Sequence, residues 1–174
     1  MQNILFISWS PKKWNTDTLL SHIFDESDGN KSIILLREKN IKHCLWCWFC
    51  EKHGVCAIKD DMQDITQDLL WADIIVFWSP NYFANISGIS KIFIDRTLSL
   101  YHSQGLKGKK IFLVMPGASS DSTNQKYLLQ AAFWFIHYQH MKLLWAYGYC
   151  TGKKSIFDKK IKNITKQIVK KMSE

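Results

Sequence analysis

The sequence predicts a single α/β domain in which helices cover both faces of a parallel sheet. Short apolar runs rich in β-branched and aromatic residues alternate with stretches of helical spacing along the whole chain. The apolar runs are continuous rather than interrupted by polar residues, which is typical of strands buried on both faces. The 174 residues, 47% of them hydrophobic, suffice for one packed core, and no repeat or linker divides them. We therefore expect one three-layer α/β/α domain over residues 1–174.

The first two strands and the helix between them are expected before the cysteine-rich part of the chain. Residues 3–9 form a continuous apolar run, which predicts a buried strand. A helix is expected over residues 16–25, where the apolar side chains share one face, and Gly29 ends it. The apolar run at residues 32–36 predicts the second strand.

The middle of the chain contains a segment without a clear period, followed by two helices and a strand. The segment covers about residues 41–58 and contains most of the cysteines. A helix is expected from about residue 60 to residue 70, with Asp60 as its N-cap. The apolar run at residues 73–78 predicts the third strand, and the spacing of apolar residues over 86–101 predicts the next helix.

The last third repeats the alternation. The fourth strand is expected over residues 110–115, where a proline and a glycine end it. A helix is expected over 121–138, the fifth strand over 142–147, and a final helix from residue 157 to residue 172. Five strands separated by helices imply right-handed crossovers, so all strands end at the same edge of the sheet. Ligands of such folds bind beyond that edge.

The loop after the first strand, residues 8–18, combines hydroxyl groups, an amide and two lysines with the start of a helix. The unpaired N–H groups and the dipole at a helix N-terminus suit a phosphate group, and hydroxyls can donate further hydrogen bonds to it. A simpler interpretation is a helix capped by Asn15 or Thr16 with no ligand. The loop contains neither the dinucleotide fingerprint nor the P-loop pattern, which argues against a Rossmann NAD site and a P-loop nucleotide triphosphatase.

Two further loops follow the third and fourth strands. Residues 79–85 contain two adjacent aromatic residues, two amides and a proline, whereas residues 116–120 are small and polar. Backbone amides and an aromatic side chain in such loops can cradle a planar polar ring. A phosphate seat beside a flat slot is the arrangement expected for FMN at the first and third strands of a doubly wound sheet.

At these loops the sequence resembles the NADPH-dependent FMN reductase family of flavodoxin-like proteins. The family's first-loop pattern, Ser-Pro-Arg-Lys-x-Gly-Asn-Thr, is similar to the seven residues Ser10-Pro11-Lys12-Lys13-Trp14-Asn15-Thr16, in which Lys12 replaces the arginine and Trp14 stands where the family has glycine. Its second loop and the following helix are matched by Ser79-Pro80-Asn81-Tyr82-Phe83, Ser87-Gly88, Lys91, Phe93 and Asp95-Arg96. The resemblance runs from residue 1 to about residue 120.

The resemblance implies a flavodoxin-like, doubly wound five-stranded parallel sheet with the strand order 2-1-3-4-5. It implies that the phosphate and ribityl chain of FMN are bound by Ser8, Ser10, Lys12, Asn15, Thr16 and Thr18. The flavin ring is expected to be bordered by Ser79, Pro80, Asn81, Tyr82, Phe83, Asn85 and Gly117. Asp95 and Arg96 are expected to tie their helix into the fold rather than to touch the flavin.

The function that the resemblance implies is an FMN-dependent oxidoreductase with NAD(P)H as co-substrate, which passes electrons to a quinone, a flavin or another small-molecule or protein acceptor. Because the cofactor supplies the chemistry, no catalytic residue is expected in the chain. A non-enzymatic electron-transfer module is the alternative, and a flavin-free domain of the same fold is a third interpretation. A homodimer or higher homo-oligomer is expected, because a second subunit often completes the ring slot in similar proteins.

Four cysteines lie within thirteen residues, at Cys44, Cys47, Cys50 and Cys56. Thiolates at this spacing can ligate a [4Fe–4S] cluster, and the segment resembles that of the iron–sulfur flavoproteins, which pair such a cluster with FMN. Zinc, with His43 or His53 as a substitute for one of the cysteines, and free or redox-active thiols are the alternative interpretations. Cys150, beyond the fifth strand, is expected to be a buried small side chain.

Charge and hydropathy narrow the expected partners and location. The net charge is +8, and eight lysines lie between Lys153 and Lys171. We expect these to form the solvated face of the last helix, the alternative being a docking face for an acidic electron-transfer partner or a nucleotide. No nucleic-acid motif accompanies the charge, so no nucleic-acid partner is expected. No apolar run reaches the roughly 18 residues of a membrane span, and the start lacks the basic region of a signal peptide, so we expect a cytoplasmic protein with no membrane partner.

Overall fold

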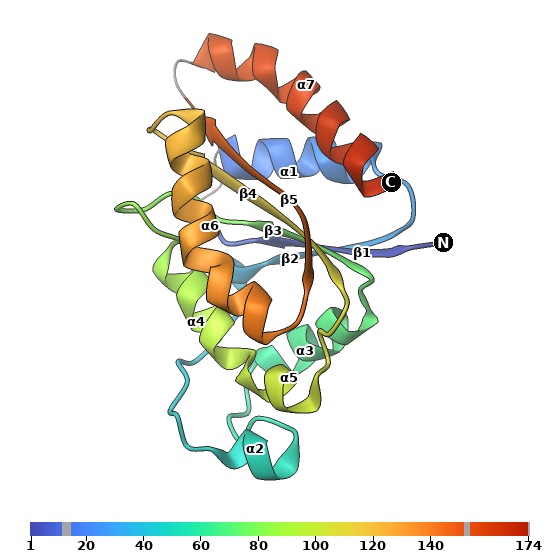
Figure 1. Ribbon diagram of the computed structural model, residues 1–174, viewed down its shortest axis with the longest axis vertical. Coiled ribbons are helices and arrows are strands. Elements are labelled where there is room, and N and C mark those ends of the chain that lie inside the picture. Colours follow the sequence, from blue (N-terminus) through green and yellow to red (C-terminus); the bar gives the residue numbers. More distant parts are fainter. Residues whose placement is uncertain (12–14, 152–153, 174) are drawn as a thin grey trace.

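The computed structural model describes residues 1–11, 15–151 and 154–173, with the side chains of residues 15–16 and 154–159 outside that description. The described residues form one five-stranded sheet in which all neighbouring strands are parallel (Figure 1). The strand order is β2-β1-β3-β4-β5, which confirms the predicted doubly wound topology. The strands are β1 (Asn3–Ser8), β2 (Asn30–Leu35), β3 (Ile74–Trp78), β4 (Lys110–Gly117) and β5 (Lys142–Cys150).

Helices cover both faces of the sheet, so the structure has the three predicted layers (Figure 1). One face is covered by α1 (Asn15–Glu26) and α7 (Lys154–Ser173). The other is covered by α3 (Met62–Trp71), α4 (Gly88–Arg96), α5 (Leu98–Ser103) and α6 (Asp121–Tyr138). A short helix, η1 (Leu36–Glu38), follows β2, and α2 (Phe49–His53) lies in the cysteine-rich segment. None of the helices in the described part of the chain is long and apolar enough to cross a bilayer.

Side chains along β1 and at Trp9 alternate between two apolar cores, as a strand buried on both faces requires. Leu5, Ile7 and Trp9 pack against the helices α3, α4 and α6. Ile4 and Phe6 point the other way and pack against α1 and α7. All five side chains are buried, so the strand that leads into the first loop is held from both sides.

Two helices begin or end differently from the prediction. The helix predicted over 86–101 is divided into α4 and α5 at Thr97, whose hydroxyl donates a hydrogen bond to the carbonyl of Ile94 (2.7 Å). Such side-chain bonds compete with the regular helical pattern. The helix expected to follow an Asp60 N-cap begins instead at Met62, with Asp61 at the N-cap position. The carboxylate of Asp60 still accepts a hydrogen bond from the N–H of Met62 (3.1 Å), besides its bonds from Arg96.

The fourth and fifth strands run farther than predicted. β4 continues through Pro116 to Gly117, where its partner residue on β5 is Cys150. Pro116 has no N–H to donate, but its carbonyl accepts a hydrogen bond from the N–H of Asn81 (2.9 Å), so the proline does not end the strand. Cys150 is the last residue of β5 and only partly buried, so the expectation of a buried residue beyond the strand is wrong.

Candidate functional site

The carboxyl ends of β1, β3 and β4 bring the three predicted loops to one edge of the sheet. Ser8 of β1 is in register with Trp78 of β3, and Trp78 is in register with Val114 of β4. Hydrogen bonds continue this pairing beyond the strands: the N–H of Trp9 donates to the carbonyl of Trp78 (2.9 Å), and that of Ser79 donates to the carbonyl of Val114 (3.1 Å). The three loops therefore start side by side.

In the first loop, the best-defined polar contact is one that the sequence analysis did not anticipate. Ser8 is fully buried, and its hydroxyl donates to the carboxylate of Asp17 (2.8 Å). The other oxygen of Asp17 pairs with Arg37 (2.8 Å), which follows β2. A phosphate at this loop would therefore receive its hydrogen bonds from other groups than the Ser8 hydroxyl. Ser10 is buried and Thr18 is exposed, while Lys12 and the side chains of Asn15 and Thr16 lie outside the described part.

The second loop projects beyond the sheet between β3 and α4 (Figure 1). Its tip is a tight turn in which the backbone N–H groups and carbonyls of Tyr82 and Asn85 bond to each other (2.8 and 3.0 Å). Phe83 and Ala84 at the centre of the turn both have positive φ angles, 51° and 62°, which is unfavourable for residues with a side chain. Phe83 is fully exposed at this tip. The turn therefore presents an aromatic ring to the space beyond the edge.

Asn124, the first-turn residue of α6 that the sequence analysis missed, connects the second and third loops. Its side-chain oxygen accepts a hydrogen bond from the amide of Asn81 (2.8 Å), and its amide donates to the carbonyls of Ser119 (2.9 Å) and Tyr149 (3.0 Å). A Cβ atom on Gly117 would lie 2.5 Å from the Asn124 side-chain oxygen. Gly117 is thus required here for the close approach of Asn124, a role that the sequence did not predict.

Three serines connect the second loop to the first. The hydroxyl of Ser87 donates to the carbonyl of Trp9 (2.9 Å), which directly precedes Ser10. The hydroxyl of Ser90 lies 2.7 Å from that of Ser87 and 3.0 Å from that of Ser79. Ser87 and Ser90 were not predicted as site residues, although their hydroxyls hold Ser79 and the first loop in place.

The residues at this edge fit FMN. The side-chain oxygen of Asn81 is buried and has no hydrogen-bond partner among the described residues, so it can accept a bond from a ring N–H. Tyr82 and Phe83 provide exposed aromatic surface beside it. The structure brings the predicted residues of the second and third loops together, namely Ser79, Pro80, Asn81, Tyr82, Phe83, Asn85 and Gly117. The ligand contacts of each of them stay a prediction.

The four cysteines of the segment at residues 41–58 share one neighbourhood. All are free thiols: Cys50 is buried, Cys44 and Cys56 are partly buried, and Cys47 is exposed. Burial raises the pKa of the Cys50 thiol, and the charges of Cys56, Cys44 and Cys47 raise it further. Among the described residues no three His, Cys, Asp or Glu side chains converge as a metal-binding group does. The donor types fit a [4Fe–4S] cluster, but their side chains are not arranged around a common centre.

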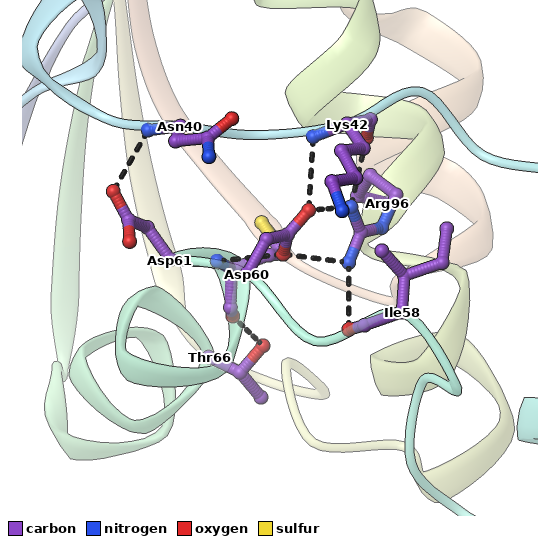
Figure 2. Close-up of polar contacts among 8 residues, drawn as sticks. Asn40, Lys42, Ile58, Asp60, Asp61, Thr66 and Arg96 are labelled. Carbon is purple, nitrogen blue, oxygen red and sulfur yellow. Dashed lines mark hydrogen bonds and ion pairs between the residues drawn. The ribbon is translucent and has the colours of Figure 1, made fainter.

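A buried ion pair lies at the base of this cysteine-rich segment (Figure 2). Arg96 donates to both carboxylate oxygens of Asp60 (2.5 and 3.0 Å), and both side chains are shielded from solvent. The backbone N–H groups of Lys42 (2.9 Å) and Met62 (3.1 Å) also donate to this carboxylate. Burial alone would raise the pKa of Asp60, but the hydrogen bonds from Arg96, Lys42 and Met62 outweigh it and lower that pKa below 3.8. The prediction that Arg96 ties its helix into the fold is confirmed, whereas Asp95 pairs with Lys91 on the exposed face of the same helix.

The lowered pKa of Asp60 predicts acid sensitivity. A carboxylate whose pKa is lower in the folded than in the unfolded state stabilises the fold above its unfolded pKa, and this contribution is lost as the pH falls through the folded pKa. We expect the stability difference between the wild type and Asp60→Asn to be constant near neutral pH and to shrink below about pH 4. Urea unfolding of both proteins across this range measures it. A difference that does not change with pH would contradict the assignment.

A parallel sheet of order 2-1-3-4-5 with polar loops after β1, β3 and β4 defines a flavodoxin-like protein. Residues 2–151 match the model of the NADPH-dependent FMN reductase family, and the chain belongs to that family. This confirms the family that the loops had suggested.

Relatives and solved structures agree with this classification. An iron-sulfur flavoprotein of Methanocaldococcus jannaschii is 30% identical over 139 residues, which cover 77% of this chain and 72% of that protein. An iron-sulfur flavoprotein of Archaeoglobus fulgidus is 41% identical over 97 residues, 54% of this chain and 48% of the relative, so the match spans about half of that protein. The fold is shared with a protein from Streptococcus mutans (TM-score 0.75, 13% identity, 97% of this chain and 99% of that chain). It is also shared with a putative quinone reductase from Klebsiella pneumoniae (TM-score 0.72, 13% identity, 97% and 84%).

Proposed function

We propose that the protein binds FMN at the edge formed by the three loops and acts as an NAD(P)H-dependent oxidoreductase. The observation that supports this most directly is the buried side-chain oxygen of Asn81, which has no hydrogen-bond partner in the described part of the chain. The amide of the same side chain donates to Asn124 at the flavodoxin-like edge, and the chain belongs to the FMN reductase family. FMN supplies the capacity to accept a hydride and to release electrons to a second acceptor. The residues of the chain bind and orient the cofactor.

The proposed role of each residue in FMN binding depends on the loop to which it belongs. Ser8, Ser10, Lys12, Asn15, Thr16 and Thr18 belong to the loop that receives the phosphate and ribityl chain. Within it, Ser8 contributes through Asp17 rather than by direct donation, since its hydroxyl is already engaged. Asn81 and Gly117 border the ring edge, and the exposed aromatic side chains of Tyr82 and Phe83 cover its face.

The cysteine-rich segment is proposed to hold a [4Fe–4S] cluster as a second redox centre. Cys44, Cys47, Cys50 and Cys56 supply the thiolates, and the N–H of Trp46 already donates to the sulfur of Cys44 (3.4 Å). The relatives from M. jannaschii and A. fulgidus named iron-sulfur flavoproteins support this assignment. Electron transfer to a protein acceptor without turnover of NAD(P)H is the second candidate function. The four-cysteine segment favours it, because a second redox centre can pass electrons from the flavin to a protein.

The visible spectrum and cofactor content of protein purified without oxygen test these assignments. We expect about one FMN per chain and, after reconstitution, about four irons per chain. Oxidation of NADH or NADPH with a quinone or free flavin as acceptor would establish the enzyme and exclude the pure carrier. Flavin without such oxidation, reduced only by a protein donor, would favour the carrier. A protein that contains no flavin and does not take it up would refute the proposed function.

Replacing one of the proposed cluster ligands should lower the iron content of the protein without changing its flavin content. The Cys50→Ser variant is expected to lose nearly all of the iron of the reconstituted protein and to keep its FMN, because the cysteine-rich segment is distinct from the three loops. Cys150→Ser is the matched control, since Cys150 lies at the end of β5 outside the segment. Equal iron in both variants would contradict the ligand assignment and favour free thiols.

Self-association is proposed to bury the aromatic surface of α5, α6 and the cysteine-rich segment. Trp134 and Tyr138 of α6 are exposed and stack on each other (5.4 Å between ring centres), and Tyr101 of α5 lies next to Tyr138 (6.1 Å). With Trp46 and Trp48 these rings line a pocket of about 500 Å³. Monomers rarely expose so continuous an aromatic surface, and a second copy of the chain, which presents the same surface, is the proposed cover.

The Trp134→Glu variant tests this interface. We expect it to weaken dimerisation by about 30-fold or more, because buried tryptophans at interface centres contribute most of the binding energy. Light scattering over a concentration series measures the effect. Trp71→Glu, on exposed Trp71 of α3, is the control and should dimerise like the wild type. A wild type that stays monomeric at all concentrations would contradict the proposal.

A further inference from the structure

One face of α4 contacts three parts of the chain that the proposed function uses. Its buried residues are Ser90, Phe93 and Arg96, which are spaced three apart and therefore lie along one side of the helix. Helix α4 begins directly after the second loop and ends at the base of the cysteine-rich segment. The helix thus connects the flavin edge to the four cysteines.

The first turn of α4 is hydrogen-bonded to the edge of the sheet at which flavin binding is proposed. The Ser90 hydroxyl lies within hydrogen-bond distance of the hydroxyls of Ser79 and Ser87, and Ser87 donates to the carbonyl of Trp9. The ring of Phe93 packs on that of Trp9 with 5.0 Å between ring centres. The first half of the buried face is therefore bonded to residues of the first and second loops.

At its last turn α4 is fastened to both ends of the cysteine-rich segment (Figure 2). Arg96 donates to the carbonyl of Lys42, which precedes the first cysteine of the segment (2.7 Å), and more weakly to that of Ile58, which follows the last (3.5 Å). Asp60 accepts a hydrogen bond from the N–H of Lys42 (2.9 Å) and the two bonds from Arg96. One guanidinium and one carboxylate thus close the segment into a loop.

Within a single copy of the chain, few buried contacts hold the segment in place. Within residues 43–57, all of which the structure describes, Cys50 is the one buried residue. Its large apolar side chains, including Trp46 and Val55, are exposed, so the burial of apolar area stabilises its position only weakly. A segment with few buried contacts opens locally at low cost unless hydrogen bonds retain it. The ion pair at its base provides most of those bonds, and it is shielded from solvent. Two further bonds join the flanking residues Asn40 and Asp61 (2.7 and 3.3 Å), and these stay intact when Asp60 or Arg96 is replaced.

We propose that Arg96 and Asp60 are positioning residues that hold the cysteine-rich segment closed and attach it, through α4, at a fixed place relative to the flavin loops. Between Ser90 and Arg96 the helix rises by about 9 Å, which sets the spacing of the two attachments along its axis. The inference rests on the proposed function for its significance, since it links the two redox sites. The closure itself is a property of the chain and is measurable without either cofactor.

The test measures the reactivity of individual cysteines in iron-free protein with iodoacetamide, followed by peptide mass mapping. The variants are Arg96→Gln and Asp60→Asn, and the control is Lys91→Gln, which removes a cation from the exposed face of the same helix. Cys150 outside the segment is the internal reference. We expect both variants to raise the rate at Cys50 relative to Cys150 by about tenfold or more, because opening of the segment limits access to a buried thiol. The control should change this ratio by less than about twofold.

Because Cys150 is only partly buried, it corrects for the reagent and the conditions but does not report global unfolding. Urea unfolding of the same variants distinguishes positioning from general destabilisation, since local opening raises the Cys50 rate by more than the change in global stability accounts for. An unchanged ratio in Arg96→Gln and Asp60→Asn would overturn the proposal, and so would loss of the fold in both, because a local closure should leave the sheet intact. Iron uptake after reconstitution should fall in the same two variants while flavin content is kept. A wild type without flavin would defeat the proposed function, yet the cysteine ratio would still decide the positioning role.

Discussion

Replacing Gly148 with alanine is expected to lower the free energy of unfolding by about 3 kcal/mol or more and to disturb flavin binding at the same time. A Cβ atom on Gly148 would lie 2.0 Å from the backbone nitrogen of Gln125 and 2.6 Å from the carbonyl oxygen of Asp121. Both obstructing atoms belong to the backbone of α6, so the start of the helix would have to move away from β5. Asn124, which connects the second and third loops, would move with it.

Gly88→Ala is the matched control for this substitution. Gly88 is the first residue of α4, and a Cβ atom there would meet nothing within 4 Å. We expect its stability to change by less than about 1 kcal/mol, in the stabilising direction, because alanine restricts the unfolded chain and favours helix. Chemical unfolding and flavin titration of both variants provide the measurement. A Gly148→Ala protein as stable as Gly88→Ala would show that α6 does not pack as closely on β5 as the structure has it.

Asn124→Ala is expected to lower the free energy of unfolding by about 3 kcal/mol, roughly 1 kcal/mol for each of the three hydrogen bonds that Asn124 makes. The substitution also leaves the amide of Asn81 and the carbonyls of Ser119 and Tyr149 without their partner. Because Asn124 is fully buried, water does not replace these bonds freely. The second and third loops then lose their connection, and FMN affinity should fall.

Gln125→Ala separates the loop connection from general damage to α6. Gln125 is the neighbouring residue and makes one side-chain hydrogen bond, to the carbonyl of Ala146 (2.7 Å). Its removal should cost about 1 kcal/mol and leave flavin affinity unchanged. Fluorescence titration with FMN, combined with urea unfolding, compares the two variants. Equal flavin affinity in both would mean that Asn124 supports the fold without shaping the flavin edge.

The positions of the strands were predicted correctly, because each strand is a short apolar run of consecutive residues. Apolar runs identified all five strands of the described chain. The central strands β1, β3 and β4 are buried on both faces and need apolar residues at almost every position, whereas the edge strands β2 and β5 are more exposed. The ends of β4 and β5 were not predicted, since Pro116 and Gly117 resemble a strand end in sequence. Their place in the sheet depends on partners distant in the chain, namely the N–H of Asn81 and the strand β5.

The candidate site was predicted only where its residues are contiguous in the sequence. The second-loop residues from Ser79 to Phe83 form a contiguous motif and could be recognised in the sequence. Asn124 bonds to Asn81, 43 positions away, and Asp17 bonds to Ser8, nine positions away. Neither Asn124 nor Asp17 belongs to a recognisable motif. Asp60 was identified as a helix cap from its local position, whereas its carboxylate is bound to Arg96, 36 residues farther along the chain.

The sequence by itself determined the class of fold, the family, and the loops and cysteines at which chemistry is expected, because all of these follow from residues close together in the chain. Only the tertiary structure decided which groups are free to bind a ligand and which already have partners. In the folded chain the Ser8 hydroxyl donates to Asp17, while the side-chain oxygen of Asn81 has no hydrogen-bond partner among the described residues. Arg96 and Asp60 form the buried ion pair at the base of the cysteine-rich segment. The physical reason is that burial strengthens and selects polar contacts, and burial is a property of the packed chain rather than of any local pattern.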